Sequence, residues 1–146
     1  MVKRLCAITV VVILAIFTVR NAVYASGTQY TVPENIEWMA VMTKGVHGRY
    51  FYVYLRGAAG DKCGQLMRIK FPDGFVYPWH VNDMYGIYTI LQGILILGFD
   101  KHHLRSAERS LPAGSVVQGL TTEPHYGRAV GETIFDAYLP CDPAVK

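Results

Sequence analysis

Alternating apolar and polar residues dominate the chain after its first 25 positions. Residues 50–55 (YFYVYL) are aromatic and β-branched, and residues 65–71 (QLMRIKF) alternate so that Met67, Ile69 and Phe71 share one face. A period of two residues is typical of strands that are buried on one side. Residues 26–146 contain no long stripe of period 3.6, so the pattern predicts an all-β fold.

Glycine and proline divide the rest of the chain into short apolar runs. We predict a tight hairpin at Gln92-Gly93 and a polar, irregular segment over residues 100–108. Many short strands separated by turn residues indicate one barrel or sandwich. The further strands are predicted over residues 75–82, 87–91, 94–99, 115–118, 125–130 and 133–139.

The first 25 residues have the pattern of an export signal. Lys3 and Arg4 precede an apolar run over residues 5–19, and Val23-Tyr24-Ala25 has small residues where a signal peptidase cuts. The run is shorter than the roughly 20 residues that a membrane-spanning helix needs. We therefore predict a signal peptide over residues 1–25 and an exported domain, periplasmic or secreted, over residues 26–146. An uncleaved membrane anchor is the alternative.

Cleavage would also change the charge of the protein. The whole chain has 14 Lys and Arg against 11 Asp and Glu, and Lys3, Arg4 and Arg20 would be removed with the signal. The remaining 11 basic and 11 acidic residues balance. No basic stripe remains, so we expect no nucleic-acid partner, and no membrane association after cleavage.

Two cysteines, Cys63 and Cys141, follow the predicted signal. Thiols in an oxidising compartment tend to pair, so we predict a disulfide that ties the C-terminal tail to an early connection between strands. Two unpaired thiols are the alternative.

Two segments carry the candidate chemistry. Residues 71–93 contain His80 after the turn Pro72-Asp73-Gly74, and residues 111–125 end in His125 after a second Pro-x-Gly turn. Two histidines on separate strands, each behind such a turn, suggest a small barrel whose interior is lined by side chains. Both imidazoles are predicted to converge there.

These segments resemble the two motifs of the cupins, most closely those of small single-domain bacterial cupins. Gly74, His80 and Gly93 keep the spacing of the first motif, and His125 matches the histidine of the second. The runs GFDK (residues 98–101) and LPAGS (residues 111–115) add to the likeness, which covers residues 64–138. The resemblance implies a single antiparallel jelly-roll barrel with a pocket at one mouth.

The metal ligands of that family are only partly present. Asn82 stands where the second histidine belongs, Gly86 where the glutamate belongs, and Ala129 where an asparagine often lies. A divalent transition metal needs three or four donors, including a negative oxygen. His80, Asn82 and His125 would bind one poorly unless Glu123, Asp83 or a ligand carboxylate joined them, so the metal site is predicted to be degenerate.

What remains is a pocket for a small molecule. The predicted ligand-binding residues combine the histidines with an amide and aromatic rings, and His80, Tyr85 and His125 are the candidates for acid–base catalysis without metal. For any single aromatic residue, a place in the barrel core is the simpler interpretation. The predicted set is Trp79, His80, Asn82, Tyr85, Tyr88, His125 and Tyr126.

Three functions are compatible with this pattern. The first is an exported cupin-like protein that binds a small organic molecule in the barrel mouth. The second is a metal-dependent cupin enzyme, an oxygenase, isomerase or lyase, with His80 and His125 as ligands. The third is a structural or subunit-interaction role, because cupins often pair edge strands into homodimers.

Overall fold

A computed structural model of the protein describes residues 30–42, 46–61, 63–81, 85–102, 104–119 and 123–141. The chain divides into two compact units, Met1–Tyr30 and Thr31–Lys146, and the description below concerns the second. The predicted signal peptide lies outside the described residues. Among the described residues, no helix is long and apolar enough to cross a membrane.

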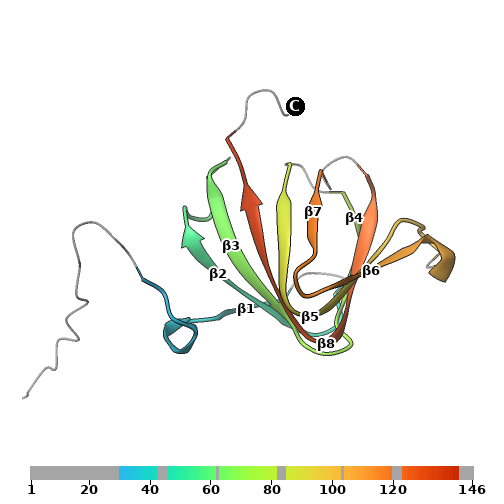
Figure 1. The fold of residues 1–146 in the computed structure, drawn as a ribbon, viewed down its shortest axis with the longest axis horizontal. Coiled ribbons are helices and arrows are strands. Elements are labelled where there is room, and N and C mark those ends of the chain that lie inside the picture. The colour runs from blue at the N-terminus through green and yellow to red at the C-terminus, as the bar shows by residue number, and fades with distance from the viewer. Residues whose placement is uncertain are drawn as a thin grey trace, which may run out of the picture. The chain divides into compact units, whose positions relative to one another are not determined.

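The predicted all-β fold is confirmed. Eight antiparallel strands form one sheet in the order β1-β2-β3-β8-β5-β6, and in addition β4 pairs with β8 and β7 with β5 (Figure 1). Two short 3₁₀ turns, Pro33–Asn35 and Arg105–Ala107, are the helical elements of the described chain. The strands are β1 (Met39–Val41), β2 (Tyr50–Arg56), β3 (Gln65–Phe71), β4 (Val76–His80), β5 (Ile87–Gly98), β6 (Glu108–Pro112), β7 (Val116–Gln118) and β8 (His125–Leu139).

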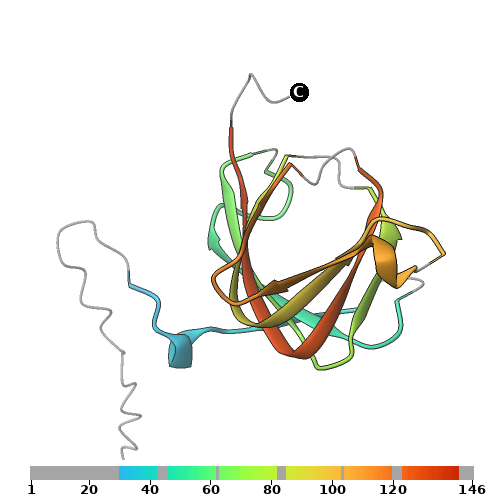
Figure 2. The same cartoon turned by 45° about the vertical axis from the view of Figure 1, so that its right-hand side comes forward.

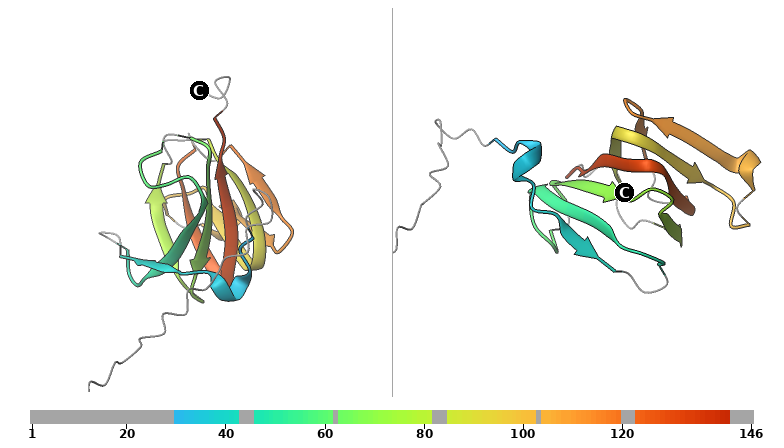
Figure 3. Two further views of the ribbon diagram at one scale, coloured as in Figure 1. Left: turned by 90° about the vertical axis from the view of Figure 1, so that its left-hand side faces the viewer. Right: turned by 90° about the horizontal axis from the view of Figure 1, so that it is seen from below.

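The sheet curls around a central space, as Figure 2 shows. Seen from below in Figure 3, the green strands β2 and β3 lie apart from the yellow and orange strands β5 and β6, with the red strand β8 between them. Long strands of a strongly curved sheet need bends, and here β5 and β8 bend together. Their register passes from Gln92↔Ile134 to Ile94↔Val130, across Gly93 (φ +70°) and Gly131 (φ +71°).

The hairpin predicted at Gln92-Gly93 is therefore wrong, and so is the division of residues 125–139 into two strands. Each glycine has a positive φ, but it makes a bulge that turns the strand without reversing it. Thr133 is fully buried beside the bend, where its Oγ1 lies 3.1 Å from the carbonyl oxygen of Ile94. Strand β6 was not predicted, because its sequence, ERSLP, is mostly polar.

Apolar side chains fill one end of the barrel. Phe71 and Phe75 pack with ring centroids 4.7 Å apart, and Tyr50 lies 5.7 Å from each of them. Such edge and tilted contacts between rings add to the stability that apolar burial provides. The buried cluster consists of Phe71, Phe75, Ile90, Leu95, Leu97, Ala129 and Phe135.

The predicted disulfide is present between Cys63 and Cys141. It joins the residue two places before β3 to the residue two places after β8. These two strands already pair from Gln65↔Leu139 to Phe71↔Thr133. The disulfide thus adds a covalent link between two strands that backbone pairing already joins.

Candidate functional site

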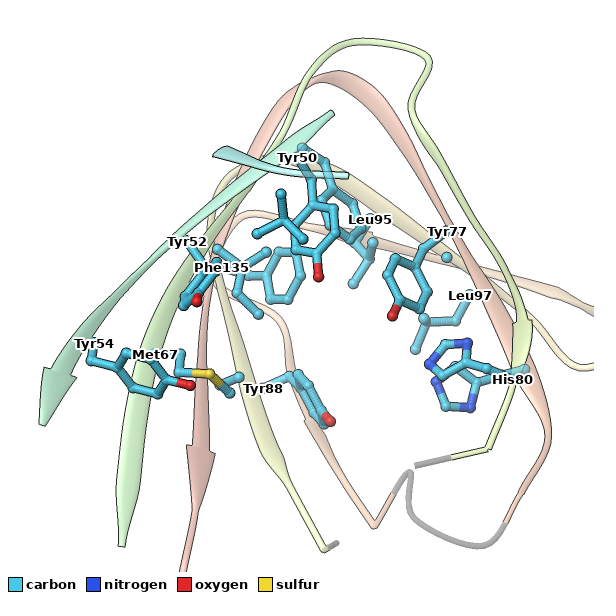
Figure 4. Close-up of a pocket in the computed structure, with 16 residues that line it drawn as sticks. Tyr50, Tyr52, Tyr54, Met67, Tyr77, His80, Tyr88, Leu95, Leu97 and Phe135 are labelled. Atoms are coloured by element: carbon cyan, nitrogen blue, oxygen red, sulfur yellow. The ribbon is translucent and has the colours of Figure 1, made fainter. Parts of the chain in front are cut away.

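The barrel contains an open cavity of about 430 Å³. Five tyrosines and two histidines supply its polar groups, and Figure 4 shows the hydroxyls of Tyr50 and Tyr77 directed into it. None of the described residues that line it carries a formal charge. The residues with polar groups are Tyr50, Tyr52, Tyr54, Tyr77, Tyr88, His80 and His125. The main apolar residues are Met67, Ile69, Phe71, Leu95, Leu97 and Phe135.

Strand β2 contributes three of the tyrosines. Its alternation puts Tyr50, Tyr52 and Tyr54 on one face, and the register Tyr52↔Ile69 aligns that face with the cavity-facing side of β3. The rings of Tyr52 and Tyr54 meet edge to face at 5.4 Å. The result is a wall of phenol rings, continued on β3 by Ile69 and Met67.

Strands β4 and β8 bring the two histidines together. His80 and His125 are register partners, and their ring centroids lie 4.4 Å apart. We predicted that the two imidazoles converge although His80 and His125 lie far apart in the chain. The fold does bring them together. His125 is only 3% exposed, and His80 contacts the Tyr77 ring at 4.7 Å.

Both imidazoles are held in the same way. Nδ1 of His80 lies 2.8 Å from the Pro78 carbonyl oxygen, and Nδ1 of His125 lies 2.8 Å from that of Glu123. A carbonyl oxygen only accepts hydrogen bonds, so each Nδ1 carries the proton. In the neutral ring the lone pair is then on Nε2.

A bulge in β4 decides which of its residues face inward. Tyr77 pairs with Gly127 and His80 with His125, so β4 has one residue more than β8 between these pairs. Without the extra residue, Trp79 would share the face of Tyr77. With it, His80 lines the cavity while Trp79 is 37% exposed and does not.

Burial raises the pKa of three of the cavity tyrosines. Desolvation raises the pKa of Tyr88, and it raises the pKa of Tyr77 together with the nearby Tyr50, which also hydrogen-bonds with Tyr77. Desolvation likewise raises the pKa of Tyr54. Their hydroxyls thus remain neutral donors and acceptors at physiological pH.

The structure brings together only part of the predicted set. His80, Tyr88 and His125 line the cavity, whereas Tyr85 does not and has its hydroxyl 3.5 Å from Oε1 of Gln118. Asn82, and with it the predicted third metal donor, lies outside the described residues.

Tyr126 is buried on the opposite face of β8. Its hydroxyl donates to Oε1 of Glu108 at 2.7 Å, and Nη2 of Arg128 lies 3.1 Å from Oε2 of the same carboxylate. Burial and this carboxylate raise the pKa of Tyr126 to about 12. The hydrogen bond from Tyr126, supported by Arg128, lowers the pKa of Glu108. This cluster does not line the cavity.

The donors that the described residues place at the cavity are too few for a divalent metal ion. Among the described residues, no three His, Cys, Asp or Glu side chains lie close enough to hold one. The described site supplies two neutral nitrogens and no carboxylate to offset the charge of the ion.

The space of the missing carboxylate is occupied. A Cβ placed on Gly86 would lie 2.6 Å from the Tyr88 ring and 2.8 Å from its hydroxyl. A glutamate at this position therefore requires Tyr88 to move.

The site residues that were not predicted are mostly on the early strands. Tyr50, Tyr52 and Tyr54 alternate in the sequence, and that alternation is the signal that marks them. Tyr77 has no comparable signal, because the bulge that turns both Tyr77 and His80 inward is not evident from local residues.

Comparison with known proteins supports the fold. No protein-family model matches the chain, and no curated protein matches it in sequence. Among solved structures, the polyketide cyclase RemF from Streptomyces resistomycificus is similar, with a TM-score of 0.63 and 15% identity over 79% of this chain and 80% of that one.

Two further structures extend this likeness. A predicted oxalate decarboxylase from Thermotoga maritima has a TM-score of 0.58 and 21% identity over 75% of this chain and 96% of its own. A cupin superfamily protein from Desulfitobacterium hafniense has a TM-score of 0.54 and 17% identity, over 77% and 93% of the two chains. The described domain has the cupin fold.

Proposed function

We propose that this chain is an exported cupin-fold protein that binds a small organic molecule inside its barrel through side chains alone. The observation that carries the proposal is the cavity of about 430 Å³, in which five tyrosine rings accompany a pair of converging histidines. Sites for small molecules are mostly apolar and concave, with a few polar groups that fix orientation, and range over about 300–1,000 Å³.

A metal-dependent enzyme is the second candidate. Both imidazoles donate through Nδ1 to backbone carbonyl groups, which is how metal-ligating histidines are commonly held. Several proteins of similar fold are named as enzymes, among them a putative acetylacetone dioxygenase from Methylibium petroleiphilum. The donor set weighs against this candidate, because Gly86 replaces the expected carboxylate and Tyr88 packs against it.

Elemental analysis separates the two candidates. Protein purified without an affinity tag is expected to contain no stoichiometric Fe, Mn, Ni or Zn. A metal present at one atom per chain, and lost in His80→Ala, would favour the enzyme.

Binding itself is tested with a cavity-filling variant. Ala137 is buried and lines the cavity, so Ala137→Phe projects a ring into it. Val130→Phe adds the same ring at a position that is 41% exposed and serves as the control. A diverse panel of small molecules, screened by thermal shift and native mass spectrometry, should yield ligands that bind wild type and Val130→Phe but not Ala137→Phe. A panel with no such ligand would contradict the proposal.

Export is tested separately. The disulfide is compatible with an oxidising compartment. Expressed with its own N-terminus, the protein should be recovered from the periplasm or medium, and N-terminal sequencing should begin at Ser26. Retention of residues 1–25 on membrane-bound protein would favour the anchor instead.

A further inference from the structure

We propose that the ligand of the barrel is an organic cation whose quaternary ammonium group packs between the rings of Tyr52 and Tyr54. The inference rests on the proposed function and names the chemical class of the molecule. It follows from three observations at this wall of the cavity, namely the angle between the two rings, the thioether beside them and a nearby carboxylate.

Tyr52 and Tyr54 form a ring corner in the wall of the cavity. They are alternate residues of β2, both line the cavity, and both are half-buried. Their ring centroids lie 5.4 Å apart, with 89° between the ring planes. The face of an aromatic ring carries negative potential, so a cation between two perpendicular rings is attracted by both. Aromatic cages recognise quaternary ammonium groups in this way.

The outer face of the same strand already makes a contact of this kind. Nζ of Lys70 lies 4.4 Å from the ring centroid of Trp38 and 5.2 Å from that of Phe51. Phe51 and Lys70 are register partners on β2 and β3. There the protein supplies the cation itself, whereas in the ring corner the ligand would supply it.

A neighbouring thioether favours a methylated head group over a primary amine. Met67 is the register partner of Tyr54, and Figure 4 shows the two side chains next to each other in the cavity wall. A thioether accepts hydrogen bonds only weakly, but it packs well against apolar and polarizable groups. A primary ammonium group that leaves water needs strong acceptors for its three N–H groups. A quaternary ammonium group presents methyl groups instead, so it suits a wall of rings and sulfur.

A carboxylate near the ring corner adds negative potential. The pKa of Tyr54 is raised first by desolvation, then by Tyr52 and by the charge of Asp61. This carboxylate is held in place, because the amide of Ala58 donates to its Oδ2 at 2.7 Å. Nε2 of Gln65 also donates to the backbone oxygen of Asp61 at 2.9 Å. The negative potential that disfavours a phenolate here attracts a cation and repels an anion.

The position of the ring corner leaves room for the rest of the molecule. Figure 4 shows Tyr52 and Tyr54 across the cavity from His80. A ligand whose cationic group lies on β2 therefore extends toward the part of the cavity that the histidines line. Because a cavity of about 430 Å³ is near the lower end of the range for small-molecule sites, we expect a small cation, and choline is a suitable probe.

The test compares choline with two relatives by isothermal titration calorimetry on the purified protein. In 3,3-dimethylbutan-1-ol a carbon atom replaces the charged nitrogen at the same shape, and ethanolamine keeps the charge but lacks the methyl groups. We expect choline to bind about tenfold more tightly than each of them, which is the discrimination that desolvated cation–π contacts give. Absence of choline binding, or equal or tighter binding of either relative, would overturn the inference.

Variants locate the contact. Tyr54→Leu should weaken choline about tenfold and leave the neutral alcohol unchanged, whereas Tyr54→Phe keeps the ring and should stay within about twofold of wild type. Tyr52→Leu is the second variant in case Tyr54→Leu does not fold. Tyr138→Leu is the matched control, because it makes the same change at a residue that does not line the cavity. Unchanged choline binding in the folded Leu variants, or an equal loss in Tyr54→Phe, would contradict the contact with the ring faces.

A further variant tests the carboxylate. Asp61→Asn keeps an oxygen that can accept from Ala58 and removes the charge. It should weaken choline about two- to fivefold at low salt, less at high salt, and leave the neutral alcohol unchanged. Unchanged or tighter choline binding would contradict the role of Asp61.

The same experiments separate this inference from the proposed function. If a neutral or anionic compound binds more tightly than choline and Ala137→Phe abolishes its binding, the barrel is a binding site and the assignment of a cation is wrong. If no compound binds in a manner that Ala137→Phe affects, both the assignment and the proposed function are wrong.

Discussion

Two consecutive residues of β8 show how differently the two faces of one strand are used. His125 is 3% exposed and lines the cavity, while Tyr126 is 1% exposed and faces the carboxylate of Glu108. Both are buried polar residues with hydrogen bonds. On the outer side the hydroxyl completes a cluster with a carboxylate and a guanidinium, and on the inner side the imidazole is part of the lining of the cavity.

The difference teaches where stability and binding are located. The polar groups of the outer cluster satisfy one another. Gly98 is the register partner of both Tyr126 and Glu108, and the Tyr126 side chain lies over Gly98 and donates a hydrogen bond to Glu108. The inner face is open, with a cavity of about 430 Å³ beside His125. We therefore expect substitutions in the Tyr126 cluster to change stability, and substitutions of the two cavity histidines to change binding.

The largest effect is expected at Gly98. A Cβ there would overlap the Tyr126 ring, so Gly98→Ala must displace Tyr126 and break its bond to Glu108. We expect the free energy of unfolding to fall by about 2–4 kcal/mol, measured by denaturation in urea. Gly127→Ala is the matched control, because its Cβ would have 3.8 Å to the nearest atom. Equal losses in both variants would show that Tyr126 is not the cause.

A smaller loss is expected at Gly86 on the inner face. Its Cβ would lie 2.6 Å from the Tyr88 ring, which lines the cavity. Gly86→Ala should cost about 1–3 kcal/mol, and Tyr88→Ala should relieve that cost in the double variant. A double-mutant cycle in urea checks this, and strictly additive losses would contradict the contact.

Removal of one hydroxyl tests the outer cluster directly. Tyr126→Phe keeps the ring over Gly98 and removes the donor to Glu108, so it should cost about 1 kcal/mol at neutral pH. Tyr88→Phe is the control on the inner face. A larger loss in the control would reverse the proposed division between the two faces.

The same pair of variants predicts a pH dependence. The pKa of Tyr126 is raised to about 12, so its contribution to stability is complete below pH 10 and lost as the pH rises toward 12. The pKa of Glu108 is lowered from 4.5, so its contribution is present above pH 4.5 and lost as the pH falls below it. The difference in stability between wild type and Tyr126→Phe should therefore shrink at both extremes of pH.

The smallest effect on stability is expected at His125. His125→Phe keeps a ring of similar shape next to the cavity, and the carbonyl of Glu123, an exposed residue, takes a water molecule instead. The free energy of unfolding should change by less than about 1 kcal/mol, while binding of small molecules in the cavity is weakened. A large loss of stability with unchanged binding would show that His125 is a core residue rather than a site residue.

Local patterns in the sequence predicted the faces of the strands better than their connections. The alternation of residues 65–71 placed Met67, Ile69 and Phe71 on one face, and all three line the cavity. Gln92-Gly93 looks like a turn, yet it bends a continuous strand, because the outcome depends on how β8 pairs opposite it. Pairing between residues about 40 positions apart is not encoded in either segment alone.

The candidate site was predictable to a similar extent. His80 and His125 follow from motif spacing, and their convergence in the barrel follows from the cupin resemblance. Trp79 and Tyr126 do not line the cavity. A bulge in β4 turns Trp79 outward. Tyr126 points to the outer face because it directly follows His125, which points inward. The tyrosines of β2 enter the site through their register with β3, which no local rule specifies.

The bridge between Cys63 and Cys141 turns most of the barrel into a covalent ring. Both histidines belong to the ring, whereas β1 and β2, with Tyr50, Tyr52 and Tyr54, precede it along the chain. One proteolytic cut inside the ring would leave its pieces covalently linked by the disulfide. A cut within residues 57–61 would instead break the only covalent connection between the ring and strands β1 and β2. The phenolic wall is therefore held to the imidazole wall only by strand pairing and packing, and by no second covalent tie.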